Sequence, residues 1–179
     1  NELPYVKEIH IVSIKNECKE VLYLLNQKHT TEAHLYCINT TQSKYSFSYS
    51  QENKTAPLSE PLDYLYEPNA SILKAGAFNS IANHFKLQKL HPNSHLYTSY
   101  NLVKGFPGRT FKIGAVCKYN KKEILKHLSC KKANITRRNF PDSVVDIRKK
   151  TGIKEGGEHY LLATTLQNNQ PKILLCTKV

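Results

Sequence analysis

The order of strand-like and helix-like segments in the last 72 residues is the feature that most constrains the fold. Short apolar, β-branched runs predict strands, and longer amphipathic runs predict helices. The expected elements are strands at 110–119 and 133–139, helices at 121–129 and 141–150, and a hairpin of 159–166 with 172–178. Pro141 suits a first helical turn and Gly152 suits a helix end. The order β-α-β-α-β-β predicts an α+β fold, with small antiparallel or mixed sheets and helices on one face.

The remainder of the chain is dominated by short strand-like runs. Strands are expected at 8–14, 20–26, 33–39, 45–49, 63–67, 87–90 and 96–99, the first two forming a hairpin. The polar, proline-containing segment 51–61 is typical of a linker. Asn69 suits the N-cap of one helix that runs to about Phe85.

The positive charge of the chain is concentrated in its C-terminal part. The net charge is +12, yet residues 1–56 hold six basic and six acidic side chains. Residues 57–107 hold four basic and three acidic side chains, whereas residues 108–179 hold sixteen basic and five acidic ones. Such an asymmetry favours a polyanionic partner, because clustered cations attract phosphate groups at long range. The alternative is that solvated lysines only keep a small domain in solution.

Side-chain alternation separates the two arginines of the expected strand 133–139. Thr136 and Arg138 should point to one face and Arg137 to the other, so at most one arginine lies beside Thr136. An arginine in that position suits bidentate phosphate contact, whereas lysines act as diffuse point charges. For residues 148–150, the alternative is that the charges only complement a helix C-terminus.

No catalytic or metal-binding pattern is visible in the sequence. There is no GxSxG motif and no HExxH motif, so we expect neither catalytic residues nor metal ligands. The five cysteines are scattered without a CxxC pair, which favours reduced thiols in a cytoplasmic protein. No apolar run reaches the length that spans a bilayer.

An aromatic group near basic residues offers a second way to contact nucleic acid. Tyr97, Tyr100 and Phe106 are close in sequence to His91 and Arg109, and aromatic rings of this kind can stack on exposed bases. A position in the core is the expected role of Phe106.

A series of short motifs between residues 66 and 113, continued further along the chain, resembles one narrow family. The motifs are Glu67-Pro68-Asn69, Ser71–Phe78, His91-Pro92-Asn93, His95–Ser99, Phe106-Pro107-Gly108-Arg109, Lys132–Asn139 and Lys154–Gly157. In this order they resemble the C-terminal region of bacterial class I S-adenosylmethionine-dependent methyltransferases that carry a THUMP-like tail. The resemblance covers roughly residues 57–179. For the turn at His91-Pro92-Asn93 we expect a structural role.

The resemblance implies three parts. Residues 1–56 would be the terminal strands of a methyltransferase domain or, alternatively, a small independent β-unit. Residues 57–107 would be a small ferredoxin-like subdomain, and residues 108–179 a basic THUMP-like domain. A Rossmann-type catalytic domain would precede them. Because the first glycine is Gly76, residues 1–75 cannot form its glycine-rich cofactor loop. We therefore expect no cofactor site and no activity in this chain alone, with S-adenosylmethionine serving the intact protein.

The first functional hypothesis is a non-catalytic, RNA-recruiting module of a methyltransferase. Its expected partners are RNA, with transfer RNA as the first guess, and the methyltransferase domain of the same polypeptide. The expected RNA-binding residues are Lys121, Lys122, Lys131, Lys132, Arg137, Arg138, Arg148, Lys149 and Lys150. The alternative is a protein-interaction or scaffold module whose basic face docks on a partner or on the missing catalytic domain.

Overall fold

The computed structural model describes residues 3–40 and 43–179, and it divides by packing into two compact units. Unit 1 contains the chain up to Ala56, Pro68–Lys86 and Gly105–Gly108. Unit 2 contains Pro57–Glu67, Leu87–Lys104 and Arg109–Val179. By packing, residues 68–86 group with the first strands. The three domain ranges expected from the sequence remain a prediction.

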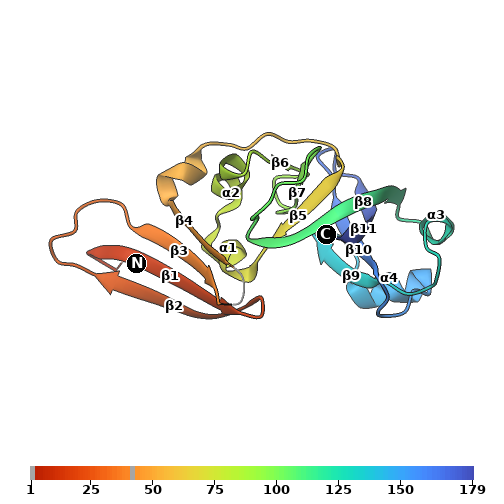
Figure 1. The fold of residues 1–179 in the computed structure, drawn as a ribbon, viewed down its shortest axis with the longest axis horizontal. Helices are drawn as coiled ribbons and strands as arrows, with labels where there is room; N and C mark the ends of the chain where they lie inside the picture. Colours follow the sequence, from red (N-terminus) through yellow and green to blue (C-terminus); the bar gives the residue numbers. More distant parts are fainter. Residues whose placement is uncertain (1–2, 41–42) are drawn as a thin grey trace. The chain divides into compact units, whose positions relative to one another are not determined.

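Unit 1 is built on a four-stranded sheet of order β2-β1-β3-β4 (Figure 1). Its elements are β1 (Val6–Ile14), β2 (Glu17–Leu25), β3 (His34–Asn39), β4 (Ser43–Ser48) and the 3-10 helix η1 (Tyr49–Asn53). The β1–β2 and β3–β4 pairs are antiparallel, whereas β1 and β3 run parallel. The predicted first hairpin is therefore confirmed, and part of the predicted linker is the 3-10 helix.

Two short helices, α1 (Ala70–Ala75) and α2 (Phe78–His84), replace the single helix that we predicted. The Asn69 side chain accepts a hydrogen bond from the Ile72 amide, which confirms the N-cap. Gly76 then adopts φ 72°, and this left-handed residue ends α1 after little more than one turn. The α1 helix packs against β1 and β3 and buries Ile72.

Unit 2 is built on a seven-stranded sheet of order β6-β7-β5-β8-β11-β10-β9 (Figure 1). Its strands are β5 (Tyr64–Pro68), β6 (Gln88–Lys89), β7 (Tyr97–Ser99), β8 (Gly108–Lys118), β9 (Asn134–Arg138), β10 (His159–Thr165) and β11 (Pro171–Lys178). The helices are α3 (Lys121–Lys126) and α4 (Val144–Thr151). This order confirms the predicted α+β fold and the final hairpin. Among the described residues, no helix is long and apolar enough to cross a bilayer.

The start of α4 differs from the prediction. The helix begins at Val144, because the Ser143 hydroxyl accepts a hydrogen bond from the Asp146 amide and so caps it. Pro141 lies before the cap and not in the first turn. Gly152, with φ 74°, ends the helix as predicted.

The large sheet carries a hydrophobic core on each face. On one face, Ile124 of α3 and Ile147 of α4 pack with Leu161 of β10. On the other face, Leu65 of β5 and Leu162 of β10 belong to one cluster with Phe111 of β8 and Leu174 of β11.

Strand β8 contributes to both cores because it contains a bulge at Gly114. Leu175 pairs with Ala115, but the next residue, Cys176, pairs with Ile113. The extra residue reverses the alternation of side chains. As a result, Ile113 faces the core beneath β5, and Cys117 faces the core beneath the helices.

Replacing Gly76 tests the break between α1 and α2. We expect Gly76→Val to lower the free energy of unfolding by about 1–2 kcal/mol, because a β-branched side chain is strained at positive φ. A Cβ here would have no neighbour within 4 Å, so the effect should be conformational and not steric crowding. Gly76→Asn is the control, since asparagine tolerates this conformation. Equal losses in urea unfolding for the two variants would contradict this account.

The thiols should differ in reactivity. Burial raises the pKa of Cys37 and of Cys176 to about 12, and it also raises the pKa of Cys117. At pH 8 these thiols stay protonated and unreactive. A disulfide reagent should therefore modify exposed Cys130 and half-buried Cys18 in the native protein, and the other three only after unfolding. Rapid native modification of Cys176 would show that the core around it opens.

Candidate nucleic-acid interface

Exposed lysines of unit 2 are brought together around the segment Gly152–Gly157, which we call loop 152–157. The α3 and α4 helices pack against each other, and the Lys121 side chain reaches Gly152 at the end of α4. On the other side of the loop, the Lys154 amide donates to the Lys131 carbonyl at 2.9 Å, and Lys132 forms a β-bridge with Lys154. The fold thus gathers cations that are separated in sequence.

Five of the nine predicted RNA-binding residues are exposed lysines without a carboxylate partner among the described residues. They are Lys121, Lys122, Lys131, Lys132 and Lys149. We call them, together with exposed Lys154, the lysine cluster. Because no carboxylate oxygen of the described residues lies within salt-bridge distance of these ammonium groups, they are available to attract a polyanion.

The other four predicted residues have partners within the protein. Lys150 Nζ lies 2.6 Å from a carboxylate oxygen of Asp142 and also over the ring of Tyr119. The hydrogen bond from Lys150, with a further one from Tyr119, lowers the pKa of the Asp142 carboxyl. Arg137 donates to the Phe140 carbonyl at 3.3 Å.

Arg148 fixes loop 152–157. Its guanidinium donates to the carbonyls of Ala133 (3.4 Å) and Ile153 (3.2 Å) and pairs with Glu155. These bonds tie the end of α4, the start of β9 and the loop together. Arg148 therefore shapes the surface on which the lysine cluster is displayed.

Arg138 belongs to a buried ion-pair network, which we call the Glu67 triad. Glu67 is 1% exposed, and each of its carboxylate oxygens accepts from one arginine. Arg138 Nε lies 3.0 Å from Oε1, and Arg109 Nε lies 2.7 Å from Oε2. Arg109 also donates to the Thr136 hydroxyl at 3.2 Å. The two arginine side chains are about one third exposed, and the triad has a net charge of +1.

The triad confirms the predicted alternation along β9. Thr136 and Arg138 both lie on the face towards Arg109, whereas Ile135 packs in the core beneath the helices. The shared face is not an open outer surface, however, because Arg138 meets Glu67 there. The assignment of Arg138 to RNA contact remains a prediction.

The His91-Pro92-Asn93 motif has the structural role that we expected. His91 Nδ1 accepts from the Asn93 amide (3.0 Å) and from Asn139 Nδ2 (3.1 Å), so Nε2 carries the proton and donates to Asn169 Oδ1 (3.2 Å). The next residue, Ser94, donates to the Thr165 carbonyl at 2.8 Å. The turn is thereby fastened to the ends of β9 and β10.

The aromatic residues near this motif have different exposures. Tyr97 is fully buried and Phe106 is 8% exposed, so Phe106 lies in a core as expected and neither ring can stack on a base. Tyr100 is 66% exposed and retains that ability.

The triad's importance for folding can be tested by removing its charges stepwise. Replacing both Arg109 and Arg138 by methionine should destabilise the protein by about 3–5 kcal/mol, because Glu67 then remains buried without a partner. Adding Glu67→Gln to this variant should recover most of the loss, since the buried charge is gone. The stabilities of the double and triple variants are compared by their midpoints of urea unfolding. If the triple variant were no more stable than the double variant, packing of the arginine stems and not charge would explain the effect.

Comparisons with known proteins match two consecutive stretches of this chain. Residues 64–107 match a family model described as a ferredoxin-like domain, and residues 108–178 match one described as THUMP domain-like. A crystal structure described as a "putative methyltransferase" from Porphyromonas gingivalis W83 is similar over 98% of this chain, with a TM-score of 0.89 and 34% identity. This chain covers 46% of that protein, about half its length. No curated protein matches the chain. The chain therefore contains a ferredoxin-like domain at residues 64–107, followed by a THUMP-like domain at residues 108–178.

Proposed function

We propose that this chain is the RNA-recruiting, non-catalytic part of an S-adenosylmethionine-dependent RNA methyltransferase. The observation that carries the proposal is the lysine cluster around loop 152–157, which lies within the THUMP-like residues. THUMP-like domains generally bind RNA, and the similar crystal structure is described as a "putative methyltransferase". Transfer RNA is the substrate class that we expect.

The lysine cluster suits contact with the phosphate backbone. Each lysine that neutralises a phosphate releases counterions, which gives affinity without reading sequence. The cluster is displayed on a surface held by Arg148, so its cations need little reorganisation on binding.

Methyl transfer is assigned to a part of the protein outside this chain. A cofactor loop of the Rossmann type needs glycines between a strand and the following helix. Among the described residues, the segments that lead from β5 to α1, from β8 to α3 and from β9 to α4 contain no glycine, so these residues do not fit such a site. The P. gingivalis protein is about twice as long as this chain, which leaves room for a catalytic domain in a protein of that kind.

The open edge of β2 suits contact with such a domain. This edge strand exposes Leu22, Tyr23, Leu24 and Leu25, each by about half. An apolar edge of this kind is normally covered by another chain segment. We propose that the methyltransferase portion of the same polypeptide covers it.

Salt dependence distinguishes RNA recruitment from a scaffold role. We expect a variant with Lys121, Lys122, Lys131 and Lys132 changed to Gln to bind a transfer RNA mixture much more weakly. The slope of log affinity against log salt should fall by about 0.7–0.9 for each phosphate that is no longer neutralised. Filter binding across a salt series measures both quantities.

The matched control removes the same charge from unit 1. Lys15, Lys28, Lys74 and Lys86 are also exposed, so changing them to Gln should leave affinity and slope nearly unchanged. Equal weakening by both sets would indicate a nonspecific effect of net charge. Salt-insensitive binding of a protein partner, with no RNA binding, would favour the scaffold alternative.

A further inference from the structure

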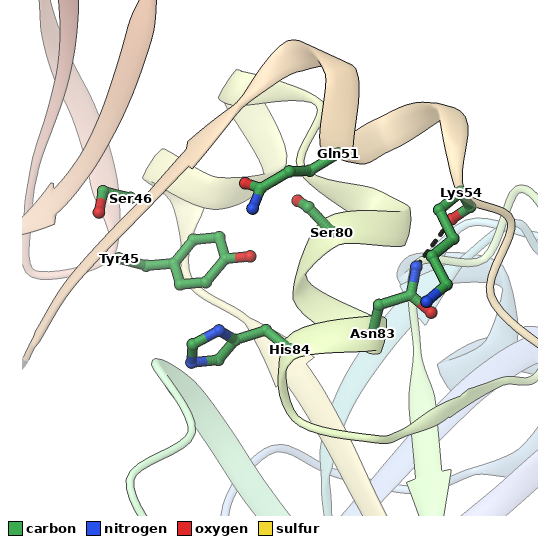
Figure 2. A pocket seen from close by; sticks show the side chains of 7 residues that line it. All are labelled: Tyr45, Ser46, Gln51, Lys54, Ser80, Asn83 and His84. Carbon is green, nitrogen blue, oxygen red and sulfur yellow. Dashed lines mark hydrogen bonds between the residues drawn. The ribbon is translucent and has the colours of Figure 1, made fainter.

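A polar cavity of about 260 Å³ lies within unit 1, between β4, η1 and α2 (Figure 2). It is lined by Tyr45, Ser46, Gln51, Lys54, Ser80, Asn83 and His84. Its volume is somewhat below that of cavities for drug-sized ligands, so it suits a compact small molecule. No pattern in the sequence predicts this site, because its residues come from segments that share no motif or spacing.

The walls of this cavity are held together by hydrogen bonds. Glu52 of η1 accepts from the backbone amides of Asn79 and Ser80, both at 2.8 Å, and so caps the start of α2. Asn79 Nδ2 donates back to the Glu52 carbonyl at 3.0 Å, and Asn83 Nδ2 donates to the Lys54 carbonyl at 2.7 Å. The η1 segment is thus fixed along α2, and the cavity is preformed.

Ser80 provides a buried polar group in the wall of the cavity. The residue is 4% exposed, and its buried hydroxyl lies near the Tyr45 phenol without a hydrogen bond of ordinary geometry among the described residues. A buried hydroxyl in this state costs about 1–3 kcal/mol unless a partner satisfies it. Figure 2 shows the Tyr45 ring and the Gln51 side chain directed towards it.

The other polar groups offer both donors and acceptors. Gln51 Oε1 accepts from the Ser48 amide at 2.9 Å, which leaves the Gln51 NH₂ group for a ligand. Asn83 uses its NH₂ group on the Lys54 carbonyl, which leaves its Oδ1 as an acceptor. Burial raises the pKa of Tyr45, with the nearby Ser80 hydroxyl opposing this, so the phenol stays protonated and can donate at neutral pH.

The charge of the lining favours an anionic group. Lys54 and His84 are exposed at the rim, and no carboxylate lines the cavity. Glu52 of η1 keeps its negative charge beside the cavity, where it helps to raise the pKa of Tyr45, but both its oxygens accept from amides of α2 and so face that helix. The His84 ring is exposed and meets the Tyr45 ring edge to face at 5.5 Å, so it offers a surface on which a planar group can stack.

We infer that this cavity binds a single nucleotide unit. The Gln51 and Asn83 amides and the hydroxyls of Tyr45 and Ser80 would contact the base and sugar. Lys54 would contact the phosphate. Amide side chains satisfy the mixed donor and acceptor edge of a base, and an ammonium group suits a phosphate. The unit can be a free nucleoside monophosphate or an unpaired residue of an RNA. Binding at this cavity does not depend on RNA binding by the lysine cluster, which belongs to the other unit.

Titrations monitored by amide NMR signals test the cavity directly. The probes are the four nucleoside 5′-monophosphates, the matching nucleosides and inorganic phosphate, each at millimolar concentration. We expect at least one monophosphate to shift the signals of residues 45–54 and 80–84. Lys54→Gln should lower the affinity for that monophosphate about tenfold but leave the affinity for the nucleoside nearly unchanged, because only the ammonium–phosphate interaction is removed. Tyr45→Phe should lower the affinity for both ligands about fivefold, because the phenol hydroxyl is lost while the ring packing is preserved.

The control is Lys86→Gln, which removes an exposed lysine of the same unit outside the cavity and should not change the affinities. A trinucleotide that binds more tightly than any monophosphate would identify RNA as the source of the unit, whereas equal or weaker binding would favour the free nucleotide. Absence of shifts with every nucleotide probe would overturn the inference. So would inorganic phosphate binding as tightly as the monophosphates, because the base would then not be recognised. Transfer RNA binding by the Tyr45→Phe variant is measured separately. Unchanged affinity for transfer RNA would show that the lysine cluster binds RNA independently of the cavity.

Discussion

The buried Glu67 carboxylate is the constraint on which the shape of unit 2 depends. Glu67 lies at the end of β5, and its partners are in β8 and β9, although three strands separate β5 from β9 in the sheet. A flat sheet could not bring these side chains together. The two arginines keep a buried charge paired, and they can do so only when β5 curls over the face that contains Leu162.

The curl determines where the lysines are displayed. One face of the sheet is occupied by β5 and the triad, so α3 and α4 pack on the opposite face, around Ile124 and Ile147. The bulge at Gly114 lets β8 supply side chains to both layers. The helices and loop 152–157 then present ammonium groups outward, away from Glu67, which pairs with Arg109 and Arg138.

Local patterns are sufficient to predict the strands but not every helix boundary or the triad. Short strand-like runs identify β4 and β9, and two such runs in succession identify the final hairpin. The small size of Gly76 is compatible with a continuous helix, whereas its positive φ ends α1. Likewise, Ser143 competes with Pro141 and caps α4. The partners of Glu67 are 42 and 71 residues away, so no spacing rule relates them. The available signal is a charged residue in the apolar strand YLYEP, which requires a buried partner.

The different uses of arginine and lysine limit how this chain can recognise RNA. Arg109, Arg138 and Arg148 use the several directed donors of guanidinium to satisfy carboxylate and carbonyl oxygens within the fold. The exposed cations are mainly lysines, whose hydrated point charges attract phosphates but do not distinguish bases. If this chain contributes to the choice of an RNA, directed hydrogen bonds must come from elsewhere. Within the described residues, the cavity lined by Gln51, Ser80 and Asn83 offers such groups. Mutations in this cavity should therefore change selectivity among RNAs, whereas mutations in the lysine cluster should change affinity for all of them.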